Sequence, residues 1–279
     1  MLVVVGLACQ EAGAALAVLL FPEVGPLGMV MLRLVFSAVL LLLIARPSLR
    51  GHSRDGWLAV LGFGLVLALM NGLFYLALAR LPLGVTVTIE VLGPLVLSIV
   101  ASKRRSAWLW ALLAFAGVVA LTGGGWDRLD PLGVLFALGA AASWAFYILA
   151  SARVGREFPG LNGLALAMTV GALIALPFGI LSAGSALLRP DLLALGAAVA
   201  VLSSTIPYAL ELIALRRLPA AVFAILLSLA PATAALAGWL LLGQELTWLE
   251  LVGIALVITA SIGAVRSSNR AASRSTPLA

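Results

Sequence analysis

The sequence predicts an all-α integral membrane protein, with ten transmembrane helices arranged as two inverted five-helix repeats. Three observations carry this prediction. The 279-residue chain is 63% hydrophobic and 10% charged, whereas soluble domains average about 25% charged residues. Its basic residues gather in the gaps between long apolar runs. A motif with spaced prolines also occurs twice, 137 positions apart.

The apolar runs are long enough for transmembrane helices. A helix that rises 1.5 Å per residue needs about 20 residues to cross some 30 Å of hydrocarbon. Helices are expected because a spanning segment must satisfy its own backbone hydrogen bonds. The ten runs are 2–21, 26–46, 56–79, 83–101, 106–123, 131–152, 161–182, 191–214, 219–241 and 247–265.

The breaks between the runs define two halves. We assign 1–123 to the first five-helix repeat and 131–265 to the second, with a glycine-rich turn between them. Most gaps are short, so successive helices are expected to be antiparallel neighbours. The polar segment 266–279 is expected to be a disordered cytoplasmic tail.

The internal repeat is centred on a turn and a proline. Shifting the chain by 137 positions places the segment 77–82, ALARLP, on 214–219, ALRRLP. It also places Pro94 on Pro231, and 8 of 18 positions match over 77–94. These paired prolines, together with Pro207, are expected to kink or hinge their helices because proline removes a helical hydrogen bond.

The distribution of basic residues predicts the topology. With the N-terminus in the cytoplasm, 13 of the 17 lysine and arginine residues lie in cytoplasmic segments and 3 lie outside. This asymmetry obeys the positive-inside rule. We therefore expect a multi-pass membrane protein with both termini in the cytoplasm. Opposite orientations of two five-helix halves are typical of secondary transporters.

The beginning of the chain does not predict a cleaved signal peptide. Apolar residues start at Leu2, without a preceding basic residue or a convincing cleavage site. An upstream start and a first helix that depends on the rest of the bundle both stay open.

Several function classes find no support in the sequence. The net charge of +6 comes from loop residues, which argues against a nucleic-acid surface. One cysteine and one histidine, His52 in a polar loop, provide no metal cluster. The turn at Gly123–Gly125 has no lysine to complete a nucleotide site. We therefore expect no enzyme activity, no cofactor and no ATPase motor.

Glu90 is the first candidate for substrate binding. It lies seven residues into its helix, about 10 Å from the outer end. Pro94 removes the helical hydrogen bond to the Glu90 carbonyl, so the kink and the carboxylate share one turn. A charge near the bilayer centre costs at least ~2.5–3.5 kcal/mol. Glu90 is therefore expected to bind a proton or a substrate ammonium, or to pair with Arg33.

Further polar groups lie at mid-depth in the first two helices. Gln10 and Glu11 would face the same cavity. Arg33 could hold a substrate carboxylate through a bidentate contact. Pairing of Arg33 with Glu11 or Glu90 is the structural alternative.

Polar and aromatic residues on other helices complete the candidate site. Asn71 and Tyr75 are four residues apart and share a helix face, as Ser143 and Tyr147 do. Trp144 lies beside Ser143 and Tyr147, too deep in its helix to belong to the aromatic belt at the membrane–water interface. These side chains are expected to line the cavity.

The eighth helix contributes a last group. Pro207 interrupts it beside Tyr208, and Glu211 follows one turn later. Tyr208 is expected to shape the substrate pocket. Glu211 is a second candidate for binding the ammonium, although it could instead pair at the cytoplasmic interface.

Together these residues resemble the drug/metabolite transporter superfamily, EamA type, and in particular the bacterial threonine/homoserine exporters. The resemblance extends from about Gly6 to Val265 and implies amino-acid export. The chain departs from the family pattern at two positions. Ala230 stands where the family pattern has an acidic residue, and Glu11 stands where an amide is more usual. The matching stretches are 20–22, 71–75, 82–84, 90–94, 143–149, 203–211 and 217–219.

The resemblance implies a secondary transporter that exports small amino acids across the bacterial inner membrane by alternating access. Its partners would be the amino acid and the lipid bilayer, without nucleic acid. Proton exchange is a hypothesis that rests on the buried carboxylates, and the oligomeric state stays open. Export of aromatic amino acids or of another metabolite is the nearest alternative. A membrane scaffold without transport is the alternative from another class, and a membrane enzyme ranks third.

Overall fold

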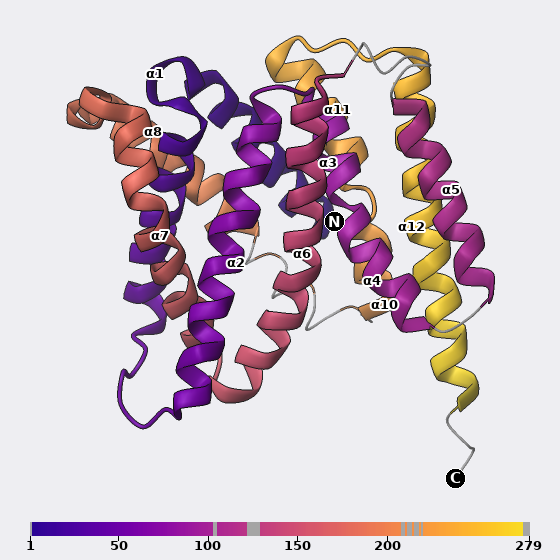
Figure 1. Ribbon diagram of the computed structural model, residues 1–279, viewed down its shortest axis with the longest axis horizontal. Coiled ribbons are helices and arrows are strands. Elements are labelled where there is room, and N and C mark those ends of the chain that lie inside the picture. Colours follow the sequence, from indigo (N-terminus) through magenta and orange to yellow (C-terminus); the bar gives the residue numbers. More distant parts are fainter. Residues whose placement is uncertain are drawn as a thin grey trace.

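A computed structural model describes residues 2–102, 105–121, 129–207, 210, 214, 218 and 220–275. Within these ranges all regular secondary structure is helical, and no strand occurs. Figure 1 shows the helices standing roughly parallel in one bundle, with α5 and α12 together at one edge. The prediction of an all-α protein is therefore confirmed for the described residues.

The first half of the chain forms five labelled helices. They are α1 (Leu2–Ala45), α2 (Arg54–Leu78), α3 (Leu83–Glu90), α4 (Leu92–Ser102) and α5 (Arg105–Leu121).

In the described part of the second half, the chain forms six α-helices and two irregular helical turns. They are α6 (Pro131–Glu157), α7 (Asn162–Ala183), the 3-10 turn η2 (Gly184–Leu188), α8 (Pro190–Ala200), the π-helical turn η3 (Val201–Thr205), α10 (Ala220–Leu227), α11 (Ala230–Leu242) and α12 (Trp248–Ser275).

Length and composition allow many of these helices to cross a membrane. Among the described residues, seven helical segments are long and apolar enough to span, and two shorter apolar helices accompany them, Trp108–Leu121 and Pro190–Thr205. Large apolar side chains cover the outside of the bundle; Leu181 is 85% exposed and Phe115 is 67% exposed. Such a surface fits contact with lipid rather than with water.

The two expected N-terminal helices are joined within α1. The expected gap at 22–25 stays largely helical, and the only non-helical backbone inside α1 is at Gly25, with φ of 71°. Glycine adopts this conformation without the steric cost of a Cβ atom. Pro26 then starts the next stretch of helix, a position that proline tolerates because its missing N–H is not needed there. The chain therefore turns back at Gly25 without a loop.

Two helix breaks fall at equivalent positions of the sequence repeat. α3 begins at Leu83 and ends at Glu90, while α10 begins at Ala220 and ends at Leu227. Each of these positions in α10 lies 137 residues after its counterpart in α3. Pro94 and Pro231 lie in the first turn of the helix that follows each break.

Close packing fixes α4 against α6. A Cβ atom on Gly93 would collide with the backbone carbonyl of Ala141. Only glycine allows the two helix backbones to approach this closely. The packing holds the segment after Glu90 against the middle of α6.

The C-terminal segment differs from the expectation. α12 continues to Ser275, so the prediction of a disordered tail is wrong for residues 266–275. The sequence between Val265 and Ser275 contains neither proline nor glycine, and the first proline is Pro277. Nothing in this stretch interrupts the helix that begins in the apolar run.

Candidate functional site, a polar cavity inside the bundle

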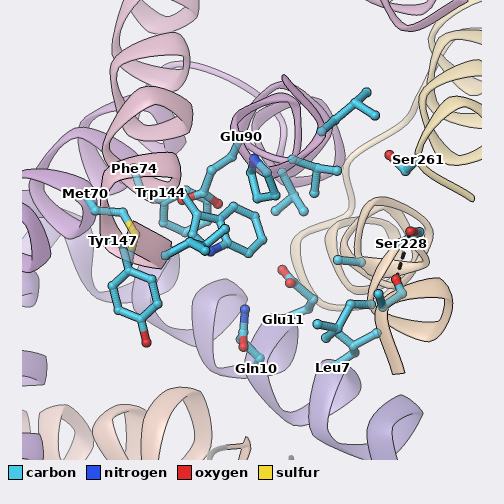
Figure 2. A pocket seen from close by; sticks show the side chains of 18 of the residues that line it. Leu7, Gln10, Glu11, Met70, Phe74, Glu90, Trp144, Tyr147, Ser228 and Ser261 are labelled. Atoms are coloured by element: carbon cyan, nitrogen blue, oxygen red, sulfur yellow. Dashed lines mark hydrogen bonds between the residues drawn. The ribbon is translucent and has the colours of Figure 1, made fainter. Parts of the chain in front are cut away.

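A cavity of about 510 Å³ lies inside the bundle. Its wall draws on both halves of the chain, from α1, α2, α3, α4 and α6 to η3, α10, α11 and α12. Figure 2 shows this cavity, with Trp144 and Tyr147 on one side and Ser228 and Ser261 on the other. The predicted site residues that line it are Gln10, Glu11, Arg33, Asn71, Glu90, Pro94, Trp144 and Tyr147.

Glu11 is the most deeply buried acidic side chain of this wall. It is 2% exposed, and its Oε2 atom has no hydrogen-bond partner among the described residues. The first part of α1 approaches η3 closely, because a Cβ on Gly13 would lie 3.0 Å from the Cβ of Ser203. This packing holds Gln10 and Glu11 in the wall. A buried ionised carboxylate needs a partner, so this oxygen is a candidate position for a cation or a proton.

Glu90 reaches the cavity from the end of a helix. It is the last residue of α3, and the chain turns at Val91 before α4 begins. Its side chain is half-buried, and Figure 2 shows it above Trp144. The charges of Glu11, Glu90 and Arg33 lie close enough to interact. The cavity therefore presents two carboxylates and one guanidinium at nearby positions.

Arg33 links the two halves of the chain. Its Nη2 donates to the carbonyl of Ser203 at 3.3 Å, and its Nε donates to the hydroxyl of Ser204 at 3.4 Å. Pro207, four residues after Ser203, has no N–H to offer this carbonyl. The guanidinium therefore donates to a backbone acceptor of the other half, in a turn where Pro207 removes one backbone donor.

Tyr75 lies behind the cavity rather than in its wall. It is fully buried and its ring packs 5.8 Å from that of Phe21. Its hydroxyl accepts a hydrogen bond from Nη1 of Arg33 at 3.4 Å. Asn71, one turn earlier, lines the cavity and donates through Nδ2 to the carbonyl of Leu67 at 2.8 Å. Tyr75 therefore supports Arg33, whereas Asn71 keeps its amide oxygen for other contacts.

The aromatic wall comes from α6. Trp144 and Tyr147 line the cavity together, and the Tyr147 ring packs 5.1 Å from that of Phe63. Ser143 does not line the cavity, and its hydroxyl donates to the carbonyl of Gly139 at 2.8 Å. This wall offers a rigid apolar surface beside the charged groups.

The remaining predicted residues lie at the edge of the site or outside the described residues. Pro207 follows η3, and Ile206 before it donates its N–H to Val201, the spacing of a π-helix. Pro231 is buried at the start of α11 but does not line the cavity. Tyr208 and Glu211 lie outside the described residues.

Sequence reasoning missed several residues of the wall. Phe74 and Met70 extend the apolar side, while Ser98, Ser228 and Ser261 add hydroxyl groups. Ser228 could have been found, since it lies at a repeat position three residues before Pro231. Ser98 and Ser261 are isolated hydroxyls in apolar runs, and no local pattern distinguishes them.

The cavity extends toward one end of the bundle. Its lining reaches Ser98 late in α4, Ile148 late in α6 and Val265 in α12. In Figure 1 these helices run downward to the end of the molecule that carries the C-terminus. At the opposite end, α3 is buried from Leu83 to Ile89. The cavity is therefore covered on that side by packed helix.

Comparison with known proteins identifies the family. The threonine/homoserine exporter RhtA of Escherichia coli K12 is 40% identical over 264 residues, which cover 94% of this chain and 89% of that protein. The RhtA protein of Salmonella typhimurium SL1344 is 38% identical over 272 residues, or 97% and 92% of the two chains. The model of the EamA-like transporter family matches residues 131–266. The chain belongs to this family.

More distant relatives agree with this assignment. The uncharacterized transporter YwfM of Bacillus subtilis 168 is 29% identical over 243 residues, covering 84% of this chain and 82% of that protein. A solved crystal structure aligns with 97% of both chains at 20% identity, with a TM-score of 0.64. At that level of identity the likeness concerns the fold of this EamA-like chain alone.

Proposed function

We propose that this protein is a secondary transporter that exports small amino acids of the threonine and homoserine type. The observation that carries the proposal is the cavity between the two halves, which places Glu11 and Glu90 together inside a membrane bundle. The names of the RhtA proteins, which share 38–40% of their residues with this chain, supply the substrate class.

The cavity offers complementary groups for a zwitterionic amino acid. The substrate ammonium would bind between Glu90 and Glu11, whose unpaired oxygen is a ready acceptor. The substrate carboxylate would bind the amides of Gln10 and Asn71 or the guanidinium of Arg33. Trp144 and Tyr147 would exclude water along one side of the bound molecule.

The proposed architecture is ten transmembrane helices in two inverted repeats, 1–123 and 131–265. The kink at Gly25 divides α1 into two spans. When the two halves are exchanged, the contacts of α2 with α6 and α7 become those of α8 and η3 with α1. The same exchange maps the contact between α5 and α12 onto itself. This correspondence, with the matched breaks after Glu90 and Leu227, supports the repeat.

The proposed topology places both termini in the cytoplasm of a bacterial cell, with 266–279 as the cytoplasmic segment. Alternating access would then move the cavity between the two sides by rocking one half against the other. Because the cavity extends toward the end that carries the basic segments, we assign the described conformation to an inward-facing state.

Purified protein in liposomes tests the function directly. We expect saturable uptake of labelled threonine that unlabelled homoserine inhibits. Inhibition by aromatic amino acids instead would favour the aromatic exporter. Absence of uptake for the whole amino-acid set would contradict the proposal and favour a different metabolite or a scaffold.

We further propose that protons are exchanged for the substrate at the paired carboxylates. Two acidic groups in one cavity can bind an ammonium in one step and a proton in another. An imposed pH gradient across the liposomes should then drive threonine accumulation above its equilibrium level. If the internal and external threonine concentrations stay equal under the pH gradient, proton exchange is wrong and transport occurs by facilitated diffusion.

A further inference from the structure

A second polar group lies in the cavity wall away from the charged residues. Ser228 and Ser261 line the same cavity, and each is 6% exposed. Figure 2 shows both on one side of the cavity, beyond Glu11 and across from Tyr147. They come from adjacent elements, because α10, which ends immediately before Ser228, packs against α12, which carries Ser261.

The hydroxyl of Ser261 is buried and makes no hydrogen bond to the described residues. Buried serine and threonine hydroxyls in helices commonly donate to the carbonyl four residues earlier, as Ser203 does to Val199 and Thr88 to Gly84. Ser261 shares its helix face with Ala264 and Val265, which also line the cavity. Its hydroxyl is therefore a free polar group in an otherwise apolar part of the wall.

Ser228 is arranged in a complementary way. It lies in the break between α10 and α11, and its hydroxyl donates to the carbonyl of Ala224 at 3.0 Å. With its hydrogen already used, its oxygen can only accept a further bond. Ser261 can still donate. The pair therefore offers one acceptor and one donor.

A hydroxyl group has both of the complementary capacities. It can donate to Ser228 and accept from Ser261, whereas an ammonium only donates and a carboxylate only accepts. We propose that Ser228 and Ser261 form a subsite for the side-chain hydroxyl of the transported amino acid. This proposal rests on the proposed function and explains how the cavity selects hydroxylated amino acids over aliphatic ones of similar size.

The rest of the cavity fits this division. Glu11 and Glu90 bind the ammonium end of the substrate, and the serine pair lies on the other side of Glu11. The lining around the serines is apolar, with Leu227 and Ala264 beside them. A substrate without the hydroxyl would leave these buried polar groups unpaired, and such sites discriminate strongly against the analogue.

Competition for labelled threonine uptake into liposomes tests the subsite. The competitors are homoserine and 2-aminobutyrate, which differ by one hydroxyl group. We expect wild-type protein to prefer homoserine, and Ser261→Ala to reduce that preference by about 10-fold or more. Ser228→Ala should reduce it in the same direction.

Ser37→Ala is the matched control. Ser37 is also a buried hydroxyl without a partner among the described residues, but it lies outside the cavity wall. Its substitution should leave the homoserine preference unchanged.

The possible results separate this inference from the function itself. If wild-type protein transports neither threonine nor homoserine, the proposed function is wrong and the subsite falls with it. If threonine is transported but both alanine variants keep the wild-type preference, the subsite alone is wrong. An equal loss for homoserine and 2-aminobutyrate would assign the serines to the common backbone of the substrate, and would also contradict the inference.

Discussion

At the scale of single residues, Arg33 acts through its contacts with the backbone of the other half. Sequence reasoning located this cation at mid-membrane and offered a substrate carboxylate or an acidic side chain as its partner. The structure adds the carbonyl of Ser203 and the hydroxyls of Ser204 and Tyr75. These partners could not be predicted, because they depend on how Pro207 reshapes a distant helix.

A double-mutant cycle tests this role. Arg33→Gln should lower the unfolding temperature of the purified protein, because a buried carbonyl without a partner costs about 1–3 kcal/mol. Pro207→Ala restores an N–H four residues after the same carbonyl, which could bond to it if the turn adopts α-helical spacing. We therefore expect the double variant to be more stable than the sum of the single effects predicts, by about 1 kcal/mol. Additive effects would show that Arg33 does not serve the acceptor freed by Pro207.

At the scale of helices, the sequence predicted the membrane spans better than their ends. Apolar runs and the breaks before Leu83 and Ala220 follow from local composition. Two other features do not follow from local composition. The joining of two runs within α1 depends on the backbone conformation of the single residue Gly25. The extension of α12 to Ser275 depends on the absence of a residue that ends the helix.

Close helix packing gives a prediction at this scale. Gly93→Ala should destabilise the protein by about 1–3 kcal/mol, since the new methyl group collides with the backbone of α6. Gly72→Ala is the control in a neighbouring helix, where nothing lies within 4 Å of the added Cβ. It should be neutral or slightly stabilising, because alanine is the better helix former. Thermal unfolding in detergent measures both, and equal effects would contradict the packing described here.

At the scale of the whole molecule, ion pairs join the two halves at one end of the bundle. Arg80 contacts Asp130 at 2.6 Å, and Arg189 contacts Glu23 at 2.9 Å and Asp191 at 2.6 Å. The hydrogen bond from Arg80 lowers the pKa of Asp130. The stabilisation of the folded protein by this ion pair is complete above the usual pKa of aspartate, and it is lost as the pH falls through the lowered pKa of Asp130. The ion pair is therefore intact at neutral pH.

Loss of these ion pairs should favour opening of the cavity on their side. The test uses Val87→Cys, a wall residue of α3, after replacement of the single native cysteine, Cys9. Adding Arg80→Gln and Arg189→Gln should increase the rate at which an impermeant thiol reagent labels this cysteine from outside the cell. Arg156→Gln, an exposed residue at the other end, is the control. Unchanged labelling would show that the ion pairs do not hold that side closed.

The candidate site was predictable in its charges but not in its hydroxyls. Glu11, Arg33 and Glu90 are conspicuous because charges are rare in membrane spans, and all three line one cavity. Ser228 and Ser261 look ordinary in the sequence. The role proposed for them follows only from the way distant helices bring them to one wall, where the Ser261 hydroxyl has no partner among the described residues.

Threonine uptake by Glu90→Gln in liposomes tests the central claim most directly, with Glu245→Gln, an exposed acidic residue, as the control. The amide keeps the shape of the side chain but removes the charge that would bind the substrate ammonium. We predict saturable uptake by wild type and Glu245→Gln, and at least a tenfold loss for Glu90→Gln, the effect of about 1.4 kcal/mol of binding energy. Wild-type uptake by the Glu90→Gln variant would contradict the assignment of this cavity as the substrate site.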